Sequence, residues 1–335
     1  MSQPVRASYV IMAALLVLVG WLHLGTLALT SLFGYFALQF FSFRRHKGLG
    51  VAIYIVAVAM ICTGLVYFSR QAYVALPKIA DTTIPAVVGF AEKQGLELPF
   101  TDYESLKTVA LNEAQEGIAG VGRYVRAAGF QLVLLVAGLV VAASLFLNSP
   151  WGAEAGLQTA QDSLYATVMR EVAGRFRTFF HSFAKVIGAQ IVISTINTGL
   201  TAVFLTLNGY PFAAVLIVLT FLCGLIPIIG NLVSNALIVG VGFSVSPRTA
   251  LFAMVFLVVI HKLEYFLNSK IIGERIKNPV WATLIALIVG DMLIGIPGMI
   301  LAPVILYYLR LELSQVPLPA PEPPRAAGPA PPPPT

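Results

Sequence analysis

The chain has 335 residues, of which 58% are apolar and only 11% are charged, and its mean hydropathy is +0.86. Soluble domains carry about 25% charged residues, so this composition excludes a protein whose main solvent is water. The formal net charge is +6, but the basic residues lie in short loops beside apolar runs, a pattern typical of membrane topology rather than of nucleic-acid binding. The two cysteines, Cys62 and Cys223, lie in separate apolar runs, which favours buried packing over a metal site or a disulfide. We therefore expect a membrane protein without a cofactor.

The first apolar run extends from about Ser8 to Phe43 and contains no signal-peptide cleavage pattern. At about 1.5 Å per residue it is longer than the roughly 30 Å hydrocarbon core, so we expect it to fold back near residues 21–26. A third run, from about Gly50 to Phe68, completes a set of N-terminal transmembrane helices within residues 1–68.

The following segment, residues 69–129, is more polar and contains six basic and seven acidic residues. Its second amphipathic stretch begins at Asp102, which we expect to be an N-cap. These features predict an extramembrane helical insert. Another transmembrane helix is expected at residues 130–147, and residues 148–185 have the pattern of an amphipathic helix with a basic face on the cytoplasmic side of the membrane.

The C-terminal transmembrane core, residues 186–313, is predicted to contain two interrupted hairpins. A span at about 186–207 precedes the first apolar run, at 212–243, and a span at about 249–267 separates it from the second, at 279–309. Pro and Gly within these runs free backbone groups that lipid cannot satisfy, so each break must lie inside protein or beside water. The interrupting residues are Gly224, Pro227, Gly230 and Asn231 in the first hairpin and Gly290, Asp291, Gly295, Pro297 and Gly298 in the second.

Lys and Arg are distributed unevenly between the two sides of the membrane. If the N-terminus is cytoplasmic, the cytoplasmic segments hold 13 of the 21 basic residues and the short outer loops hold only Arg248. We therefore expect a bacterial inner-membrane protein with both termini in the cytoplasm. The tail, residues 314–335, contains ten prolines and is expected to be disordered. The predicted fold is an all-α polytopic membrane protein with about eight transmembrane helices, two broken or re-entrant helical hairpins and a helical extracytoplasmic insert.

Ionisable side chains within the spans are candidates for a substrate or ion pathway, because each costs roughly 2.5 to 3.5 kcal/mol at the centre of a span. Glu264, on the span between the hairpins, and Asp291, at the second break, are the principal candidates. The alternative for Glu264 is an interhelical salt bridge. At Pro227, Gly230 and Asn231, unpaired backbone groups could converge on an ion or polar solute, as they do in broken-helix transporters. The alternative there is a tight turn capped by Asn231.

The span at 186–207 carries one polar stripe, formed by Gln190, Ser194, Asn197 and Thr201 at spacings of four, three and four. The stripe could line the solute path. It could equally supply interhelical hydrogen bonds, each worth about 0.6 kcal/mol.

Three sequence motifs of the second half occur in a specific order. They are Phe221-Leu-Cys-Gly-Leu-Ile-Pro-Ile-Ile-Gly230, then Glu264 followed by Lys270-Ile-Ile-Gly273 and Pro279, then Val289-Gly-Asp-Met-Leu-Ile-Gly-Ile-Pro-Gly-Met-Ile-Leu-Ala-Pro303. This ordered set resembles the AI-2E family of transporters (autoinducer-2 exporter, PerM-like), and the resemblance extends over residues 1 to about 313.

The resemblance implies a membrane protein of the eight-helix type and a homo-oligomer. In this family some members export autoinducer-2 and others exchange Na⁺ or Li⁺ for H⁺. The chain departs from the family pattern in having Ser269 and Tyr265 where Pro and Asn are common, and in adding Asp291 and Pro297 to a hairpin that is usually Gly-rich. The positions that match the family motifs are Pro227, Gly230, Glu264, Gly273, Gly290, Gly295, Gly298 and Pro303.

The sequence contains no G-x-x-x-x-G-K-[ST] run and no H-E-x-x-H pair, which disfavours ATP-driven transport by this chain alone and disfavours an enzyme. The leading hypothesis is a secondary transporter or exporter of a small polar solute such as autoinducer-2. The partners that we expect are membrane lipid, the solute and further copies of the chain. One alternative is a Na⁺(Li⁺)/H⁺ antiporter. Another is a structural or regulatory membrane protein that uses the insert and the Pro-rich tail as docking elements.

Overall fold

The structure is a computed structural model that describes residues 2–41, 47–95, 121–148, 163–227, 229–272 and 279–315. Every regular element in these ranges is an α-helix, which confirms the predicted all-α class. The expected N-cap at Asp102, the motif position Gly273 and the Pro-rich tail from residue 317 onward lie outside the described residues. The helices are α1 (Gln3–Trp21), α2 (Gly25–Phe40), α3 (Lys47–Lys93), α5 (Val121–Asn148), α7 (Leu164–Leu207), α8 (Ala213–Gly224), α9 (Ile229–Val245), α10 (Pro247–Ile272), α11 (Val280–Ile294) and α12 (Ile296–Ser314).

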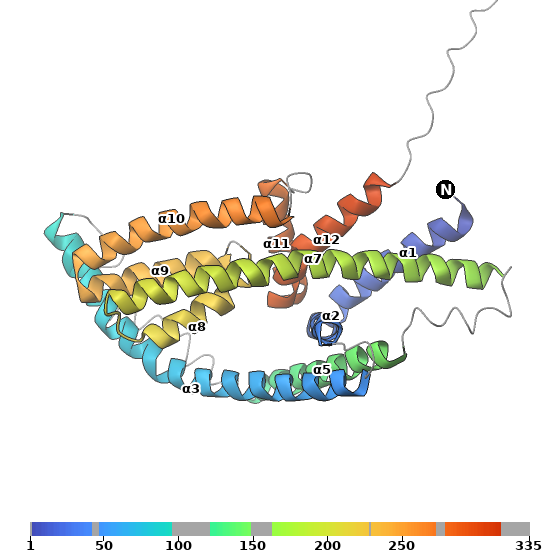
Figure 1. Ribbon diagram of the computed structural model, residues 1–335, viewed down its shortest axis with the longest axis horizontal. Helices are drawn as coiled ribbons and strands as arrows, with labels where there is room; N and C mark the ends of the chain where they lie inside the picture. Colours follow the sequence, from blue (N-terminus) through green and yellow to red (C-terminus); the bar gives the residue numbers. More distant parts are fainter. Residues whose placement is uncertain are drawn as a thin grey trace, which may run out of the picture.

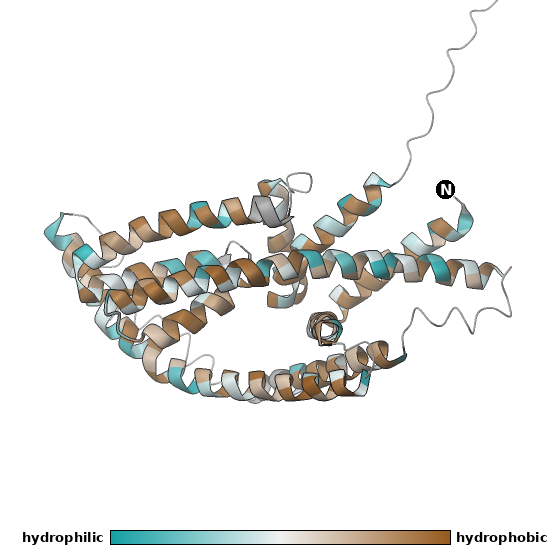
Figure 2. Ribbon diagram, in the orientation of Figure 1, coloured by the Kyte–Doolittle hydropathy of each residue, from teal (hydrophilic) through white to brown (hydrophobic). Residues whose placement is uncertain are grey.

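Six of the described helices, α1, α3, α5, α7, α10 and α12, contain a segment long and apolar enough to cross a membrane. Their outward surfaces are apolar as well: Val255 and Val258 of α10, for example, are about 60% exposed. Figure 2 shows hydrophobic residues along the outer sides of most helices. Burying such a surface in an apolar medium is favourable by about 25 cal/mol per Å², so lipid is its natural solvent. The chain is therefore a polytopic membrane protein, as predicted.

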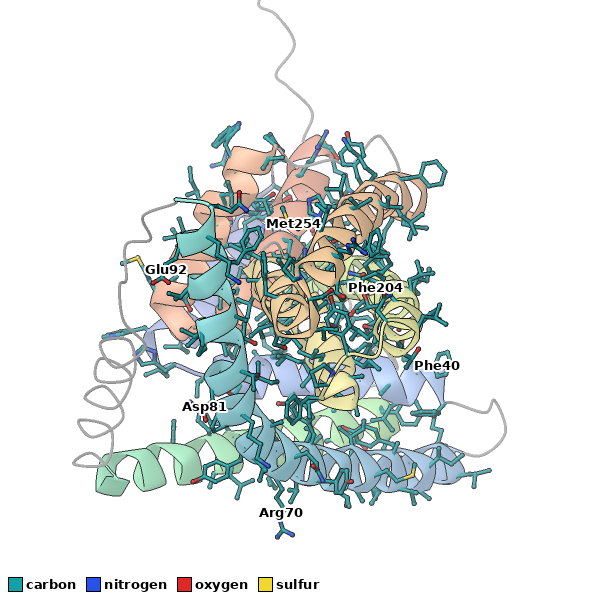
Figure 3. The ribbon with its side chains drawn as sticks, turned by 90° about the vertical axis from the view of Figure 1, so that its left-hand side faces the viewer. Phe40, Arg70, Asp81, Glu92, Phe204 and Met254 are labelled. Atoms are coloured by element: carbon teal, nitrogen blue, oxygen red, sulfur yellow. The ribbon has the colours of Figure 1, made fainter. Side chains whose placement is uncertain are left out.

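Several helices continue beyond the boundaries that the hydropathy pattern predicts. One is α5, which begins at Val121, within the segment 69–129 that we expected to form the insert. α3 crosses residue 69, where we expected the insert to begin, and continues to Lys93 through Pro77 and Pro85. Figure 1 shows that it bends in its second half, which contains both prolines. Arg70, on this helix, projects away from the other helices in Figure 3. α7 joins the basic amphipathic segment and the following span into one helix of 44 residues.

Each interrupted apolar run forms a pair of helices, as predicted. In the first hairpin α8 ends at Gly224 and α9 begins at Ile229. In the second, α11 ends at Ile294 and α12 begins at Ile296, so Gly295 alone makes the break. Gly295 has φ 66° and ψ −147°, a conformation that is open essentially only to glycine.

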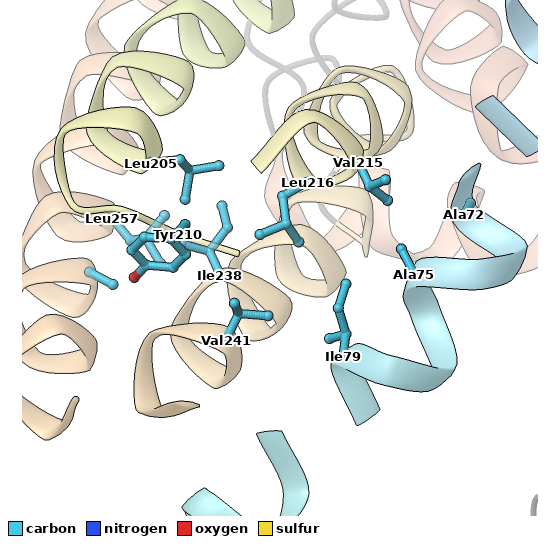
Figure 4. Close-up of a cluster of buried hydrophobic side chains, with 11 residues drawn as sticks. Ala72, Ala75, Ile79, Leu205, Tyr210, Val215, Leu216, Ile238, Val241 and Leu257 are labelled. Atoms are coloured by element: carbon cyan, nitrogen blue, oxygen red, sulfur yellow. The ribbon is translucent and has the colours of Figure 1, made fainter. Parts of the chain in front are cut away.

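The helices pack around two main groups of buried side chains, and α7 runs through both (Figure 1). Leu205 at its C-terminal end belongs to a cluster that joins the second half of α3 to α8, α9 and α10 (Figure 4). Phe204, labelled in Figure 3, stacks on Phe256 of α10 with ring centroids 4.3 Å apart. Phe183, nearer the N-terminal end of α7, belongs to the cluster that holds α1, α2 and α12. Each hairpin therefore has its own apolar core, and α7 connects the two.

Candidate functional site

The tip of the first hairpin is held by polar side chains of α7. At the end of α8 the amide of Leu225 donates to the carbonyl of Leu222, three residues earlier, as in a 3₁₀-helix. The carbonyl of Phe221, which this amide would bond in an α-helix, is therefore left without its usual partner. Ser194 Oγ donates to that Phe221 carbonyl at 3.0 Å, and Gln190 Nε2 donates to the carbonyl of Gly224 at 2.5 Å. Two members of the polar stripe therefore satisfy the end of α8.

The other members of the stripe continue along the same helix. Asn197 is half-buried and Thr201 is buried. The stripe as a whole follows α7 past the first hairpin, against which this helix packs extensively. For Gln190 and Ser194, the geometry is that of interhelical hydrogen bonds to a broken helix.

On its other side, the hairpin tip contacts an acidic side chain, Glu264. Asn231, in the first turn of α9, donates through Nδ2 to both carboxylate oxygens of Glu264 on α10, at 2.8 Å each. Asn231 is 7% exposed and Glu264 is 16% exposed, whereas the neighbouring His261 is 72% exposed, with Nδ1 3.9 Å from the carboxylate. The carboxylate thus lies beside the positive end of the α9 dipole, which stabilises a negative charge.

The two halves of the first hairpin approach one another too closely for any side chain at Gly230. A Cβ atom at that position would overlap the carbonyl group of Cys223 on α8. Pro227, in the turn between the helices, is half-buried and supplies no amide hydrogen. The end of α8 and the start of α9 therefore meet at one point, with Glu264 on one side and Gln190 on the other.

The second hairpin forms a separate locus. Gly290 and Gly298 are in backbone contact, since a Cβ atom at Gly290 would lie 2.5 Å from the Gly298 carbonyl oxygen. Pro303 lies within α12 and is half-buried. The Asp291 side chain is exposed on α11, which packs mainly on α12 and less on α1, whereas α10 packs on α9 and α7. No hydrogen bond or ion pair joins Asp291 to Glu264 in the part of the chain that the structure describes.

A buried charged cluster joins α1, α7 and α12, and we did not predict it. Arg175 of α7 forms an ion pair with Glu312 of α12, and its guanidinium lies 4.0 Å from the ring centre of Tyr9 on α1. The Tyr9 hydroxyl donates to the same carboxylate at 3.1 Å, and Arg175 Nε donates to Ser8 Oγ at 3.5 Å. Glu312 is only 3% exposed. The signal that could have found it is Glu312 itself, an acidic residue inside the last apolar helix.

Comparison with known proteins identifies the family of this chain. The family model described as "AI-2E family transporter" matches residues 7–311, which include both hairpins and α10. The chain is 30% identical over 144 residues to "Putative transport protein YdbI" of Bacillus subtilis (strain 168), covering 42% of this chain and 41% of that protein. It is 35% identical over 95 residues to "Putative transport protein YueF" of the same organism, covering 28% and 26% respectively. The matched segments thus span less than half of either relative. Because the family model covers most of its length, this chain belongs to the AI-2E transporter family.

Proposed function

We propose that the protein is a secondary transporter or exporter of a small polar solute such as autoinducer-2. The observation that carries this proposal is the first hairpin, where a helix break inside the bundle meets the Asn231–Glu264 pair and the Gln190 side chain. Broken helices of this kind present backbone dipoles to ions and polar substrates in other transporters. Membership of a transporter family and the similarity to two proteins named as transport proteins support it.

A second candidate function is exchange of Na⁺ or Li⁺ for H⁺, and the specific observation that favours it is the setting of Glu264. Its carboxylate is largely shielded, and among the described residues it bonds only the neutral amide of Asn231 at close range, with His261 more distant at 3.9 Å. A carboxylate inside a membrane protein without a permanent cationic partner is suited to bind a small cation or a proton in turn. Asp291, which is exposed, belongs to the other hairpin and is a weaker candidate.

We propose that the protein lies in a bacterial inner membrane. Both termini are then in the cytoplasm, and the segment 69–129 is on the opposite side of the membrane. This orientation rests on the distribution of Lys and Arg. We also propose that the chain works as a homo-oligomer and is in contact with membrane lipid. Much of its apolar surface faces outward, where lipid or a further copy of the chain can cover it. No enzymatic activity is part of the proposal.

The test uses the purified full chain in proteoliposomes. Two fluxes are followed, the efflux of preloaded autoinducer-2 and the pH change driven by a Na⁺ gradient. We expect autoinducer-2 efflux above that of protein-free vesicles, and a strong reduction with Glu264→Gln. Lys262→Gln, an exposed charge on the same helix, is the matched control and should leave the flux unchanged.

The two candidate functions predict different outcomes in this assay. If Na⁺-driven pH changes occur and Glu264→Gln removes them, the antiport function is favoured. If Glu264→Gln and Asp291→Asn both leave such changes intact, antiport through these carboxylates is ruled out. If the protein moves none of these solutes, the transport proposal fails.

A further inference from the structure

A hollow of about 650 Å³ lies at the tip of the second hairpin, away from the Glu264 locus. Three parts of the chain meet there: the turn between α1 and α2, the first half of α5, and the break between α11 and α12. It is an open hollow, since His23, Gln131 and Leu132 in its lining are exposed. Its lining consists of His23, Thr26, Gln131, Leu132, Leu135, Ile294, Ile296 and Pro297.

One wall of the hollow is polar but carries no carboxylate, lysine or arginine. Thr26 Oγ1 donates to Gln131 Oε1 at 2.5 Å, which leaves the Gln131 Nε2 group with no partner among the described residues. The His23 imidazole likewise has no hydrogen-bond partner in that part of the chain. His23 adopts φ 52°, in the left-handed region, within the turn that ends α1. The wall therefore offers hydrogen bonds without offering a charge to bind Na⁺ or Li⁺.

The two helices that carry the polar side chains, α2 and α5, pack closely against one another. A Cβ atom at Gly138 of α5 would lie 2.8 Å from Thr30 Cβ on α2, so the helices have no room to move closer. The same two helices carry Thr26 and Gln131, whose side chains are hydrogen-bonded to one another. Preorganised polar groups on a rigid scaffold bind a solute with little ordering cost.

The opposite wall is the apolar tip of the second hairpin. A Cβ atom at Gly25 would lie 2.9 Å from Ile294 Cδ1 and 3.1 Å from Pro297 Cβ, so the tip rests directly on the α1–α2 turn. No side-chain hydrogen bond ties this tip to another helix among the described residues, in contrast to the first hairpin with its Gln190, Ser194 and Asn231 bonds. Van der Waals contact alone sets the width of the hollow on this side.

We propose that this hollow is a binding site for a small uncharged solute bearing hydroxyl or carbonyl oxygens, held by the free hydrogen-bonding groups of Gln131 and His23 and bordered by the second hairpin tip. The proposal rests on the transport function proposed above and narrows its substrate to a neutral polar compound. Among the described lining residues there is no carboxylate, so the hollow fits a neutral polar solute better than a cation.

The test measures protection of a cysteine placed in the hollow. In the full chain carrying Cys62→Ala and Cys223→Ala, Leu132→Cys introduces an exposed thiol that lines the hollow. The purified protein in lipid nanodiscs is labelled with a water-soluble maleimide, alone, with autoinducer-2, or with NaCl. Trp21→Cys, exposed on α1 but outside the lining, is the matched control.

We expect autoinducer-2 to slow labelling at residue 132 at least five-fold and to leave labelling at residue 21 unchanged, while NaCl has no effect. Adding Gln131→Leu or His23→Leu should abolish the protection. Absence of protection, or protection that survives both substitutions, overturns the proposal, and so does equal protection by NaCl. If protection is absent although the vesicles export autoinducer-2, this site is wrong and the transport function stands. If protection occurs without any flux, the site stands and the transport function is wrong.

Discussion

The charged cluster between α7 and α12 allows a quantitative prediction about stability. Removing one member of a buried ion pair leaves the other charge uncompensated, at a cost of about 3–5 kcal/mol. Arg175→Met should lie near the upper end of that range, because Glu312 is 3% exposed and, among the described residues, retains only the hydrogen bond from the Tyr9 hydroxyl. Glu312→Leu should lie near the lower end, because Arg175 can still approach Glu171, 3.6 Å away and 39% exposed.

The double variant, Arg175→Met with Glu312→Leu, should recover most of this loss. Two apolar side chains of similar size remove both buried charges, and such replacements are often neutral or stabilising. The free energy of unfolding in detergent micelles, measured for the four members of this cycle, gives the coupling directly. Arg248→Met, an exposed charge on α10, is the control and should change stability by no more than about 0.5 kcal/mol. Single variants as stable as the parent, or losses that simply add in the double variant, would refute the reasoning.

Three further predictions concern the first hairpin. Gly230→Ala should prevent stable folding of the hairpin, since its Cβ has no room beside α8, whereas Gly188→Ala, with its nearest neighbour at 3.8 Å, should be tolerated in the same unfolding assay. Ser194→Ala should cost about 1–3 kcal/mol by leaving a buried carbonyl unsatisfied, and Thr195→Ala on the exposed face should cost far less; equal losses would contradict this. Tyr210 lies in the loop that joins α7 to α8 and belongs to the buried cluster around this hairpin. Burial raises the pKa of Tyr210 to about 12, so the stability contributed by the neutral phenol should be present below pH 10 and decline as the pH rises towards 12. Tyr210→Phe should remove that decline, and an unchanged pH profile would show that the residue does not cause it.

The positions of the two hairpins could be predicted from the sequence, because Pro227, Gly230 and Gly295 interrupt runs that are otherwise uniformly apolar. Such breaks are local signals: they depend on backbone chemistry within a few residues. The full length of α3 could not be predicted in the same way. Pro77 and Pro85 are normally read as helix ends, yet the structure accommodates both within one bent helix.

The partners of the polar side chains could not be predicted from periodicity. Glu264 and Asn231 are both visible as candidates, but their hydrogen bonds depend on how α9 and α10 cross. The pair of Arg175 and Glu312 spans 137 residues and needs the packing of α7 on α12, which a helical pattern does not specify. Glu264 and Asp291 are both candidates because each is an ionisable residue in an apolar region, and this property does not specify whether they lie close together. The structure places them on helices that pack on different partners.

The central claim is that the chain moves a small polar solute through the region around the first hairpin. The most direct measurement is flux through the purified full chain in proteoliposomes, tested with autoinducer-2, small polyols, Na⁺ and Li⁺ against protein-free vesicles. We predict saturable flux of a neutral polar solute that falls at least ten-fold with Glu264→Gln and is unchanged with Lys262→Gln. Flux that is indistinguishable from that of protein-free vesicles for every solute would contradict it.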